Sequence, residues 1–233
     1  MYLVARNVNS VWPQALSLLL ANGRARPSRN GPVVEYQDPV VTQYERPQER
    51  VLFDAVRDAN PFFHLFESLW ILAGREDVAW PAQFAPKLKE YSDNGVTFHG
   101  AYGYRIRNNG GDQLRQVVEI LKKDPSSRRA VISLWNAAWD LGKDSKDLPC
   151  NTQLYVKLRD NQVHLTVCNR SNDIIWGLYG ANVVQWSLLQ EYLAAQLDAG
   201  VGPLTTLSDS FHAYTDNPTW KAYSQGDYLP PNS

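Results

Sequence analysis

The residues best suited to covalent chemistry are a cysteine and an arginine that flank a predicted β-hairpin. Cys150 precedes a strand expected over residues 153–159, and Arg170 follows a second strand expected over residues 162–169. Because the two strands pair, the hairpin would bring the thiol close to the guanidinium. A neighbouring cation lowers the pKa of a thiol and favours the thiolate, which is the nucleophilic form of cysteine.

Composition is typical of a globular protein that can bury a sizeable core. Of the 233 residues, 44% are hydrophobic and 20% are charged, with 8 tryptophans and 12 tyrosines. We expect one α/β domain over residues 1–233. The sequence has no run of 18 apolar residues and no secretory signal, so we expect a soluble cytoplasmic protein without a membrane partner.

Cysteine usage and charge exclude further classes. The two cysteines, Cys150 and Cys168, form no disulfide framework and no metal-ligand spacing, so we expect no metal. The net charge of −1 argues against a general requirement for nucleic acid. An anionic ligand therefore needs a local arginine cluster. The basic loop at residues 23–32, with Arg26 and Arg29, could supply part of one, although a solvated surface loop is equally consistent with it.

Two helices are predicted in the first third of the chain. The first covers residues 10–21 with Ser10 as its cap. The second opens at Asn60-Pro61 and is apolar almost all round, which predicts burial. Glu67 lies inside it, and a buried carboxylate must be paired or its pKa rises. Taken alone, such a glutamate is more often structural than catalytic. Short strands are expected at 33–36 and 40–44.

Further elements must position the hairpin. Residues 77–95 read as an amphipathic helix, Asp112 caps another, and residues 183–199 form a third. Arg128 and Arg129 open a strand, where an exposed basic pair is the simpler interpretation. Alternation along residues 162–169 sends one set of side chains to each face, namely Val163, Leu165 and Val167 against His164, Thr166 and Cys168. Cys168 is expected to be a buried small hydrophobe.

Several motifs occur in an order that resembles a known family. Pro149-Cys150, Arg170-Ser171-x-Asp173, Gly177 and Asn182 resemble the active-site block of the thymidylate synthases and the related phage deoxypyrimidine hydroxymethylases. The Tyr102-Gly-x-x-x-Arg107 and His212-x-Tyr214 segments resemble family segments in the same order. The resemblance implies an α/β (α+β) fold, with a mixed sheet packed with helices and a sheet-to-sheet homodimer with shared active sites. It also implies a bacterial or phage-infected cell as the setting.

The resemblance implies a role for each matching residue. Catalytic roles fall to Cys150, Glu67, Arg170 and Tyr102, nucleotide binding to Arg29 (with Arg26 second), Arg128, Arg129, Arg170, Ser171, Asn182, His212 and Tyr214, and folate binding to Asp173, Gly177 and Tyr91. Arg107 would also line the site, and Arg128 and Arg129 would reach the partner subunit's nucleotide phosphate. The implied cofactor is 5,10-methylenetetrahydrofolate, and the substrate is a pyrimidine nucleoside monophosphate. Asn182, rather than an aspartate, favours uracil as the base.

The implied reaction is one-carbon transfer to C5 of the pyrimidine through an adduct of Cys150 with C6, and its product is the open question. Asn151 replaces a histidine, Leu88 stands where a shielding tryptophan is expected, and only 19 residues follow Tyr214. A closing tail excludes water, so these departures favour 5-hydroxymethylation of dUMP. Thymidylate synthesis and dCMP or CMP hydroxymethylation remain alternatives.

Two interpretations from other classes stay open. Cys150, His212 and an asparagine could form a Cys–His hydrolase, although that leaves the arginines without a role. A non-catalytic nucleotide-binding relative is the other, although binding alone needs no thiolate.

Overall fold

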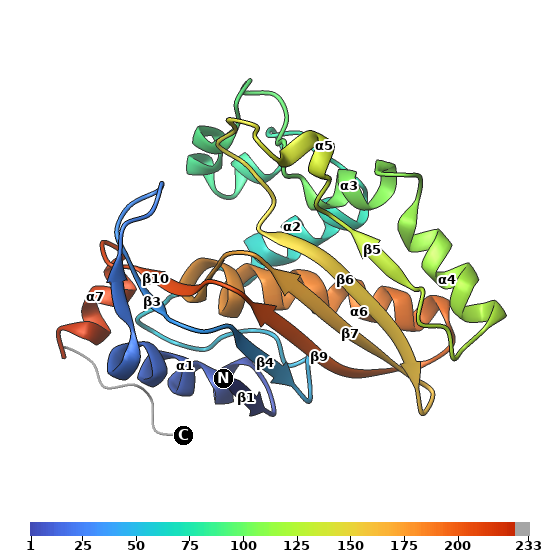
Figure 1. Ribbon diagram of the computed structural model, residues 1–233, viewed down its shortest axis with the longest axis horizontal. Coiled ribbons are helices and arrows are strands. Elements are labelled where there is room, and N and C mark those ends of the chain that lie inside the picture. The colour runs from blue at the N-terminus through green and yellow to red at the C-terminus, as the bar shows by residue number, and fades with distance from the viewer. Residues whose placement is uncertain (227–233) are drawn as a thin grey trace.

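A computed structural model describes residues 1–226 and places the predicted hairpin in the middle of a six-stranded sheet (Figure 1). In spatial order this sheet holds β1 (Tyr2–Ala5), β4 (Val40–Tyr44), β9 (Gly200–Ser208), β7 (Gln162–Asn169), β6 (Asn151–Arg159) and β5 (Val131–Ser133). A smaller sheet holds β2 (Arg24–Arg26), β3 (Val33–Tyr36), β10 (Phe211–Tyr214) and β8 (Asn172–Asp173). β6 and β7 pair antiparallel whereas β7 and β9 pair parallel, so the sheet is mixed, as predicted.

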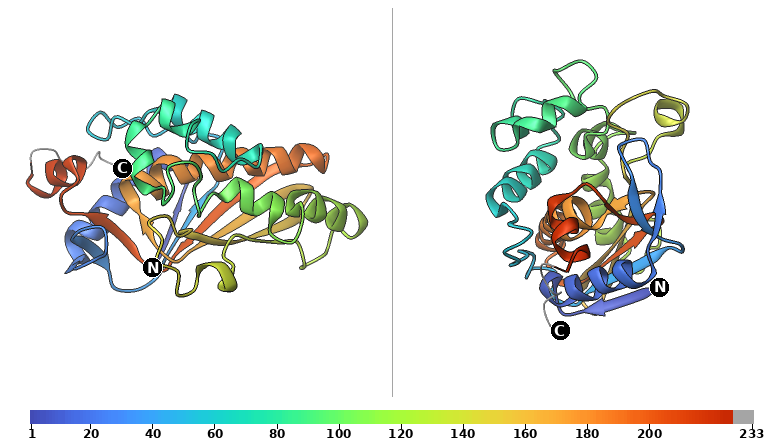
Figure 2. Two further views of the ribbon diagram at one scale, coloured as in Figure 1. Left: turned by 90° about the horizontal axis from the view of Figure 1, so that it is seen from above. Right: turned by 90° about the vertical axis from the view of Figure 1, so that its left-hand side faces the viewer.

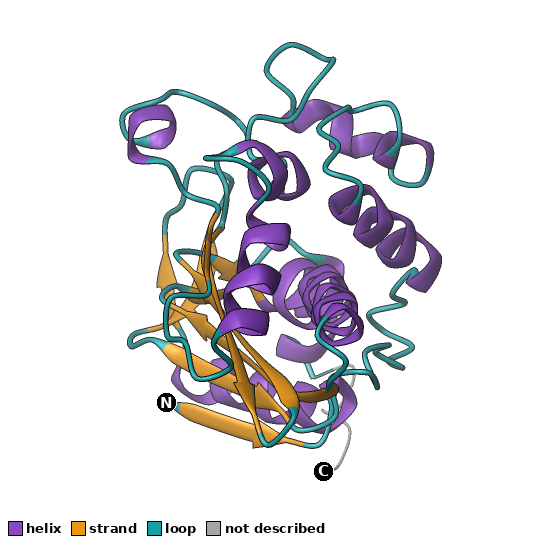
Figure 3. Cartoon of the chain, turned by 90° about the vertical axis from the view of Figure 1, so that its right-hand side faces the viewer, coloured by secondary structure: helices purple, strands orange, loops and turns teal. Residues whose placement is uncertain are grey.

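Helices α2, α4 and α6 cover one side of the large sheet (Figures 2 and 3). The helices are α1 (Val8–Asn22), α2 (Pro61–Leu72), α3 (Tyr102–Asn108), α4 (Gln113–Lys123), α5 (Ala137–Asp140), α6 (Val183–Gln196) and α7 (Pro218–Ser224), with 3₁₀ turns η1 (Pro81–Gln83) and η2 (Pro86–Tyr91) and a π-helix η3 (Ile174–Asn182). None of them, within residues 1–226, combines the length and apolar character needed to span a bilayer.

The predicted alternation of β7 is confirmed. Val163, Leu165 and Val167 are buried beneath the helices, since burial alternates along the strand. Cys168 lies on the opposite face and is only half-buried, so its predicted burial was wrong. That face carries none of the long helices α2, α4 and α6.

Two helix predictions needed correction at their ends. Helix α1 starts at Val8, because Asn7 rather than Ser10 is the cap and its Oδ1 accepts the Ser10 amide at 3.0 Å. Helix α6 ends at Gln196, and Asp198 with φ 51° turns the chain into β9. By contrast, Asn60 and Asp112 cap α2 and α4 as predicted.

The amphipathic helix predicted over residues 77–95 was wrong. Pro81 and Pro86 divide this stretch into η1 and η2, because proline offers no amide to a continuing helix. The strand expected to open at Arg128-Arg129 begins instead at Val131, and both arginines are exposed.

The predicted burial of α2 was also wrong on one side. Phe62, Leu65 and Leu69 form an exposed stripe with 69%, 40% and 47% of their surfaces accessible. The opposite side, with Phe63, His64 and Trp70, is buried as expected.

The segment that ends in Asn182 is the π-helix η3, which runs directly into α6. An i to i+5 turn holds one residue more than an α-turn and commonly marks a functional site. Gly177 and Asn182 are consequently close, since a Cβ placed on Gly177 would lie 3.4 Å from Asn182 Nδ2.

Candidate active site

The base of the hairpin brings Cys150 and Arg170 together, as predicted. The Arg170 amide donates to the Cys150 carbonyl at 3.0 Å, which fixes the two backbones side by side. Arg170 Nη2 lies 3.8 Å from Cys150 Sγ, while its Nε donates to the Pro149 carbonyl and its Nη2 to that of Leu148. The guanidinium is therefore held over the thiol by the chain segment that carries the thiol.

The predicted lowering of the Cys150 pKa was wrong. Burial raises the pKa of the thiol above 9.0, and this effect outweighs the opposing charges of Arg170 and Arg29. The carboxylates of Asp147 and Asp173 raise the pKa further. Cys150 is thus a thiol that needs further stabilisation before it becomes a nucleophile.

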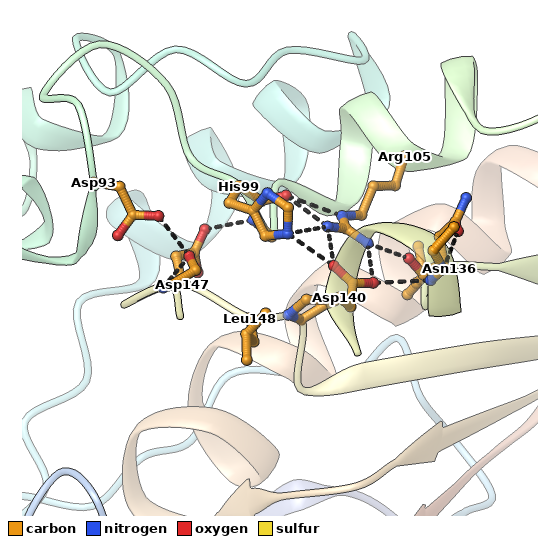
Figure 4. A network of polar contacts seen from close by, with 12 residues as sticks. Asp93, His99, Arg105, Asn136, Asp140, Asp147 and Leu148 are labelled. Carbon is orange, nitrogen blue, oxygen red and sulfur yellow. Dashed lines mark hydrogen bonds and ion pairs between the residues drawn. The ribbon is translucent and has the colours of Figure 1, made fainter. Parts of the chain in front are cut away.

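A buried ion pair that the sequence analysis missed anchors the loop before Cys150 (Figure 4). Arg105 Nη1 and Nη2 donate to the two carboxylate oxygens of Asp140, each at 2.7 Å. His99 Nε2 lies 2.8 Å from Asp140 Oδ1, and the Asn136 amide donates to Asp140 Oδ2 at 2.8 Å. Burial opposes ionisation, but the hydrogen bonds from Arg105, Asn136 and His99 hold the pKa of Asp140 below its usual value.

Three further contacts hold the same loop. Asp93 accepts hydrogen bonds from the Ser145 hydroxyl at 2.6 Å and the Lys146 amide at 2.9 Å. Asp147 accepts the Gly100 amide at 2.7 Å. Arg29 donates to the carbonyls of Ser145 and Lys146 at 2.7 and 3.2 Å. The early basic loop therefore reaches the loop before Cys150 through Arg29, whereas Arg26 is exposed in β2.

A second wall of the site comes from β8, η3 and β10. Asp173 and His212 are register partners on adjacent strands, and Asp173 caps η3 by accepting the Trp176 amide at 2.9 Å. Burial raises the pKa of Asp173, although the amides that it accepts and the nearby His212 and Arg57 oppose this. The His212 and Tyr214 rings meet edge to face at 5.5 Å.

The helices carry two further residues of the predicted site, Glu67 on α2 and Tyr102 on α3. Gln185 Nε2 donates to Glu67 Oε2 at 2.6 Å, and burial raises the pKa of Glu67 to about 7 despite that hydrogen bond. The Tyr102 ring lies tilted at 43° to that of Trp186, with 5.5 Å between the ring centroids, and the Trp186 indole N–H donates to Asn151 at 3.1 Å. Burial, followed by a negative charge on Cys150, raises the pKa of Tyr102.

Tyr91 lies beside Arg29 in a cavity of about 400 Å³ that the loop 144–146 also lines. Ser171 is half-buried next to Arg170. Arg107, expected to line the site, instead binds Asp112 at 2.8 Å and the Leu72 carbonyl at 2.9 Å. Arg128 and Arg129 are exposed, and their side chains make no hydrogen bond within residues 1–226. No group of His, Cys, Asp or Glu in this range could hold a metal ion.

We predict that Asp140→Asn lowers the free energy of unfolding by about 3–5 kcal/mol, because it leaves Arg105 charged and buried without a counter-ion. Urea denaturation at pH 7 measures this. Because the folded-state pKa of Asp140 is lowered from 3.8, its contribution is complete above that value and is lost as the pH falls through the folded-state pKa.

Asp112→Asn is the matched control, since it breaks the more exposed Arg107–Asp112 pair while asparagine can still cap α4. We expect a change of at most about 1 kcal/mol there. Equal losses in the two variants would contradict the special role of the Asp140 pair.

Comparisons with known proteins agree with this arrangement. A model of the thymidylate synthase family matches residues 13–221. A protein of Pseudomonas phage M6 named deoxyuridylate hydroxymethyltransferase is 51% identical over 213 residues, covering 91% of this chain and 61% of that protein. One of the same name from Bacillus phage SP01 is 39% identical, covering 87% and 56%. A putative thymidylate synthase of Methanosarcina mazei is 31% identical, covering 90% and 88%.

The crystal structure of thymidylate synthase from T4 phage superposes with a TM-score of 0.71 at 21% identity, covering 88% of this chain and 77% of that chain. This likeness shows the predicted fold. This chain spans about three fifths of the length of the two phage relatives.

Proposed function

Because this chain belongs to the thymidylate synthase family, we propose that it transfers a one-carbon unit from 5,10-methylenetetrahydrofolate to C5 of dUMP and releases 5-hydroxymethyl-dUMP. The observation that carries the proposal is the Cys150–Arg170 pair, on a chain 51% identical to a phage protein named for that activity. We also propose that residues 1–233 form one catalytic domain, which acts in the cytoplasm of a bacterial or phage-infected cell.

The proposed chemistry begins at the thiol. C5 of uracil is a poor nucleophile until Cys150 Sγ adds to C6, and this bond breaks again when the product leaves. Arg170, 3.8 Å from the sulfur, would stabilise the thiolate. Glu67, whose pKa lies near 7, would pass protons to and from the pyrimidine carbonyl, and Tyr102 would complete the wall beside the thiol.

The remaining residues would hold the nucleotide. Arg170 beside the thiol and Arg29 on the loop before Cys150 carry guanidinium groups that suit a phosphate, and Ser171 follows Arg170 directly. His212 and Tyr214 offer polar atoms to the sugar hydroxyl, and Asn182 offers an amide to the base. Arg26 is less suited than Arg29, because of these two arginines only Arg29 forms hydrogen bonds with the loop before Cys150 within residues 1–226.

The site also suits a folate. A Cβ on Gly177 would come within 3.1 Å of Asn172 Oδ1, so glycine leaves space beside the amides. Trp176 is 58% exposed and offers an aromatic face, while the Asp173 carboxylate could accept hydrogen bonds from ring N–H groups and Tyr91 could close the outer edge. When bound, the folate supplies a one-carbon unit at the oxidation level of formaldehyde.

The three sequence features that favoured attack by water, namely Asn151, Leu88 and the chain after Tyr214, are not the basis for choosing hydroxymethylation over methylation. Asn151 is fully buried and accepts from Trp186, so it belongs to the core rather than to a wall beside substrate. Leu88 packs half-buried against the core. The question of a closing tail concerns residues beyond 226, outside the described part of the chain. The names of the two phage relatives support hydroxymethylation.

A second candidate is thymidylate synthesis, supported by the Methanosarcina mazei relative, 88% of which this chain covers. Hydroxymethylation of dCMP or CMP is a third candidate, which the same product assay tests. A Cys–His hydrolase lacks support, because His212 Nδ1 bonds to Ser210 at 3.0 Å and Cys150 makes no hydrogen bond to a histidine within residues 1–226. A relative that only binds nucleotide would not need the thiol.

Mass spectrometry of the products formed from dUMP, dCMP and CMP with 5,10-methylenetetrahydrofolate tests the proposal. We expect dUMP alone to be converted efficiently, to a product that carries one oxygen more than dTMP. A product from dCMP but not dUMP, or no product from any of the three, would overturn the proposal.

We further propose a homodimer that forms through the sheet face opposite the helices. Side chains that are register partners on neighbouring strands form two rows across this face. One row holds Tyr2, Val41, Leu207 and Cys168. The other holds Thr166, Tyr155 and Val131. A partly exposed sheet face that carries Tyr2, Val41, Leu207, Tyr155 and Val131 suits a partner. Arg128 and Arg129, without side-chain partners in residues 1–226, would then reach the partner's nucleotide phosphate.

This arrangement predicts complementation. Arg128→Glu and Cys150→Ser should each be inactive alone and should recover activity when mixed, because one hybrid site keeps both native parts. The release of tritium from C5-labelled dUMP measures recovery, and light scattering confirms the dimer. Absence of recovery after demonstrated subunit exchange would rule out a shared site. Lys123→Glu, an exposed basic residue at the end of α4, is the control and should stay active alone.

A further inference from the structure

Three buried polar side chains from three different elements form a chain of hydrogen bonds behind the proposed base site. Asn182 Nδ2, at the end of η3, donates to Asn172 Oδ1 in β8 at 3.1 Å. Asn172 Nδ2 donates to Ser208 Oγ, at the end of β9, at 3.0 Å. Asn172 is 2% exposed and Asn182 is 9% exposed, so water competes little for these groups.

An asparagine alone cannot distinguish uracil from cytosine. Uracil presents an N–H donor at N3 and a carbonyl acceptor at C4, whereas cytosine presents an acceptor at N3 and an amino donor. One orientation of a primary amide complements uracil, and rotation by 180° exchanges its donor and acceptor and complements cytosine. Selection by Asn182 therefore requires that the orientation of its amide be fixed.

We propose that Asn172 fixes the orientation of the Asn182 amide and thereby makes the site selective for uracil. With Asn182 Nδ2 bound to Asn172 Oδ1, the Asn182 amide keeps one N–H and its oxygen for the base. Rotating Asn182 alone would set its oxygen against Asn172 Oδ1, and two acceptors in contact leave a buried polar pair unsatisfied. Ser208 Oγ accepts from Asn172 Nδ2, so the opposite orientation of both amides would require Asn182, Asn172 and the Ser208 hydroxyl to turn together.

Gly177 supports this geometry. A Cβ at that position would lie 3.1 Å from Asn172 Oδ1 and 3.4 Å from Asn182 Nδ2, so the glycine leaves both amides undisturbed. The inference rests on the proposed function, because it assumes that Asn182 meets the pyrimidine edge. It extends that function by making Asn172 a specificity-determining residue that acts through Asn182 rather than by contact with the base.

The test compares dUMP with dCMP in two assays, kcat/KM with folate and the Kd of each nucleotide without folate. Asn172→Leu removes the acceptor at similar volume and should reduce the ratio of dUMP to dCMP by about tenfold in both assays. Asn172→Asp keeps an acceptor facing Asn182 and should retain most of the wild-type ratio. Ser208→Ala frees Asn172 to rotate and should reduce the ratio by a smaller factor.

Asn169→Leu is the matched control, because Asn169 is a buried asparagine whose Nδ2 bonds only to the Leu207 carbonyl among the described residues. Its ratio should stay at the wild-type value. A wild-type ratio in folded Asn172→Leu would overturn the inference while leaving the proposed function intact. If Asn172→Leu does not fold, a wild-type ratio in Ser208→Ala has the same meaning. A wild type that binds neither nucleotide would overturn both.

Discussion

Replacing Cys150 with serine is expected to reduce turnover of dUMP by about 10⁴-fold or more, the scale on which loss of a covalent nucleophile acts in other enzymes. A serine hydroxyl is far less acidic than a thiol and adds weakly to an unsaturated ring. The variant should also fail to release tritium from C5 of dUMP, because this exchange requires addition of the sulfur at C6. The exchange assay is independent of which product the enzyme forms.

Cys168→Ser is the matched control for this prediction. Cys168 lies half-buried on the opposite face of the sheet, where the register of β7 and β9 pairs it with Leu207, and burial raises the pKa of its thiol. This variant should keep most of the exchange activity. Equal loss in the two variants, with both shown to be folded, would remove Cys150 as the assigned nucleophile.

Glu67→Gln is expected to reduce turnover by about 10²- to 10⁴-fold, the usual range for loss of a general acid–base group. The isosteric amide can still accept from Gln185, so the helix pair α2 and α6 should remain packed. In the wild type, a limb of the pH–rate profile should reflect the pKa near 7 of Glu67, and the variant should lack that limb.

The same raised pKa predicts how stability depends on pH. The folded protein holds a proton on Glu67 between 4.5 and about 7, where the unfolded chain has lost it. The contribution of Glu67 to the free energy of unfolding is therefore complete below pH 4.5 and is lost as the pH rises from 4.5 to about 7. Glu67→Gln should flatten this part of the profile in denaturant titrations. An unchanged slope would contradict the assigned burial of the carboxylate.

Gln185→Leu changes the pKa of Glu67 while it keeps the carboxylate in place. The hydrogen bond from Gln185 lowers the pKa of Glu67, whereas burial raises it. Loss of this bond should therefore move the corresponding limb of the pH–rate profile to higher pH. The maximal rate should fall much less than in Glu67→Gln. A limb that stays in place would show that it reports another group.

The hairpin and the caps were predictable because their signals are local. Alternation in residues 162–169 depends on nearest neighbours, and Asn60 and Asp112 bond to amides three residues away. The proximity of Cys150 and Arg170 followed from the hairpin register alone.

The missed features depend on contacts distant in sequence. Arg105 and Asp140 lie 35 residues apart, and no local pattern marks them as partners. The direction of the Cys150 pKa depends on how deeply the thiol is buried, which the sequence does not reveal. In α2, an apolar circumference indicated burial, but three of its residues have no covering layer within residues 1–226. The two prolines that divide residues 77–95 are, by contrast, a local signal of the break.

The folate product formed during consumption of dUMP tests the central claim most directly. Hydroxymethylation takes its oxygen from water and leaves tetrahydrofolate, whereas methylation takes a hydride from the folate and leaves dihydrofolate. We predict that dUMP disappears with no rise in absorbance in the dihydrofolate band, and that the product carries the oxygen of labelled water. Dihydrofolate formed in equal amount to the nucleotide consumed would contradict the account and make this chain a thymidylate synthase.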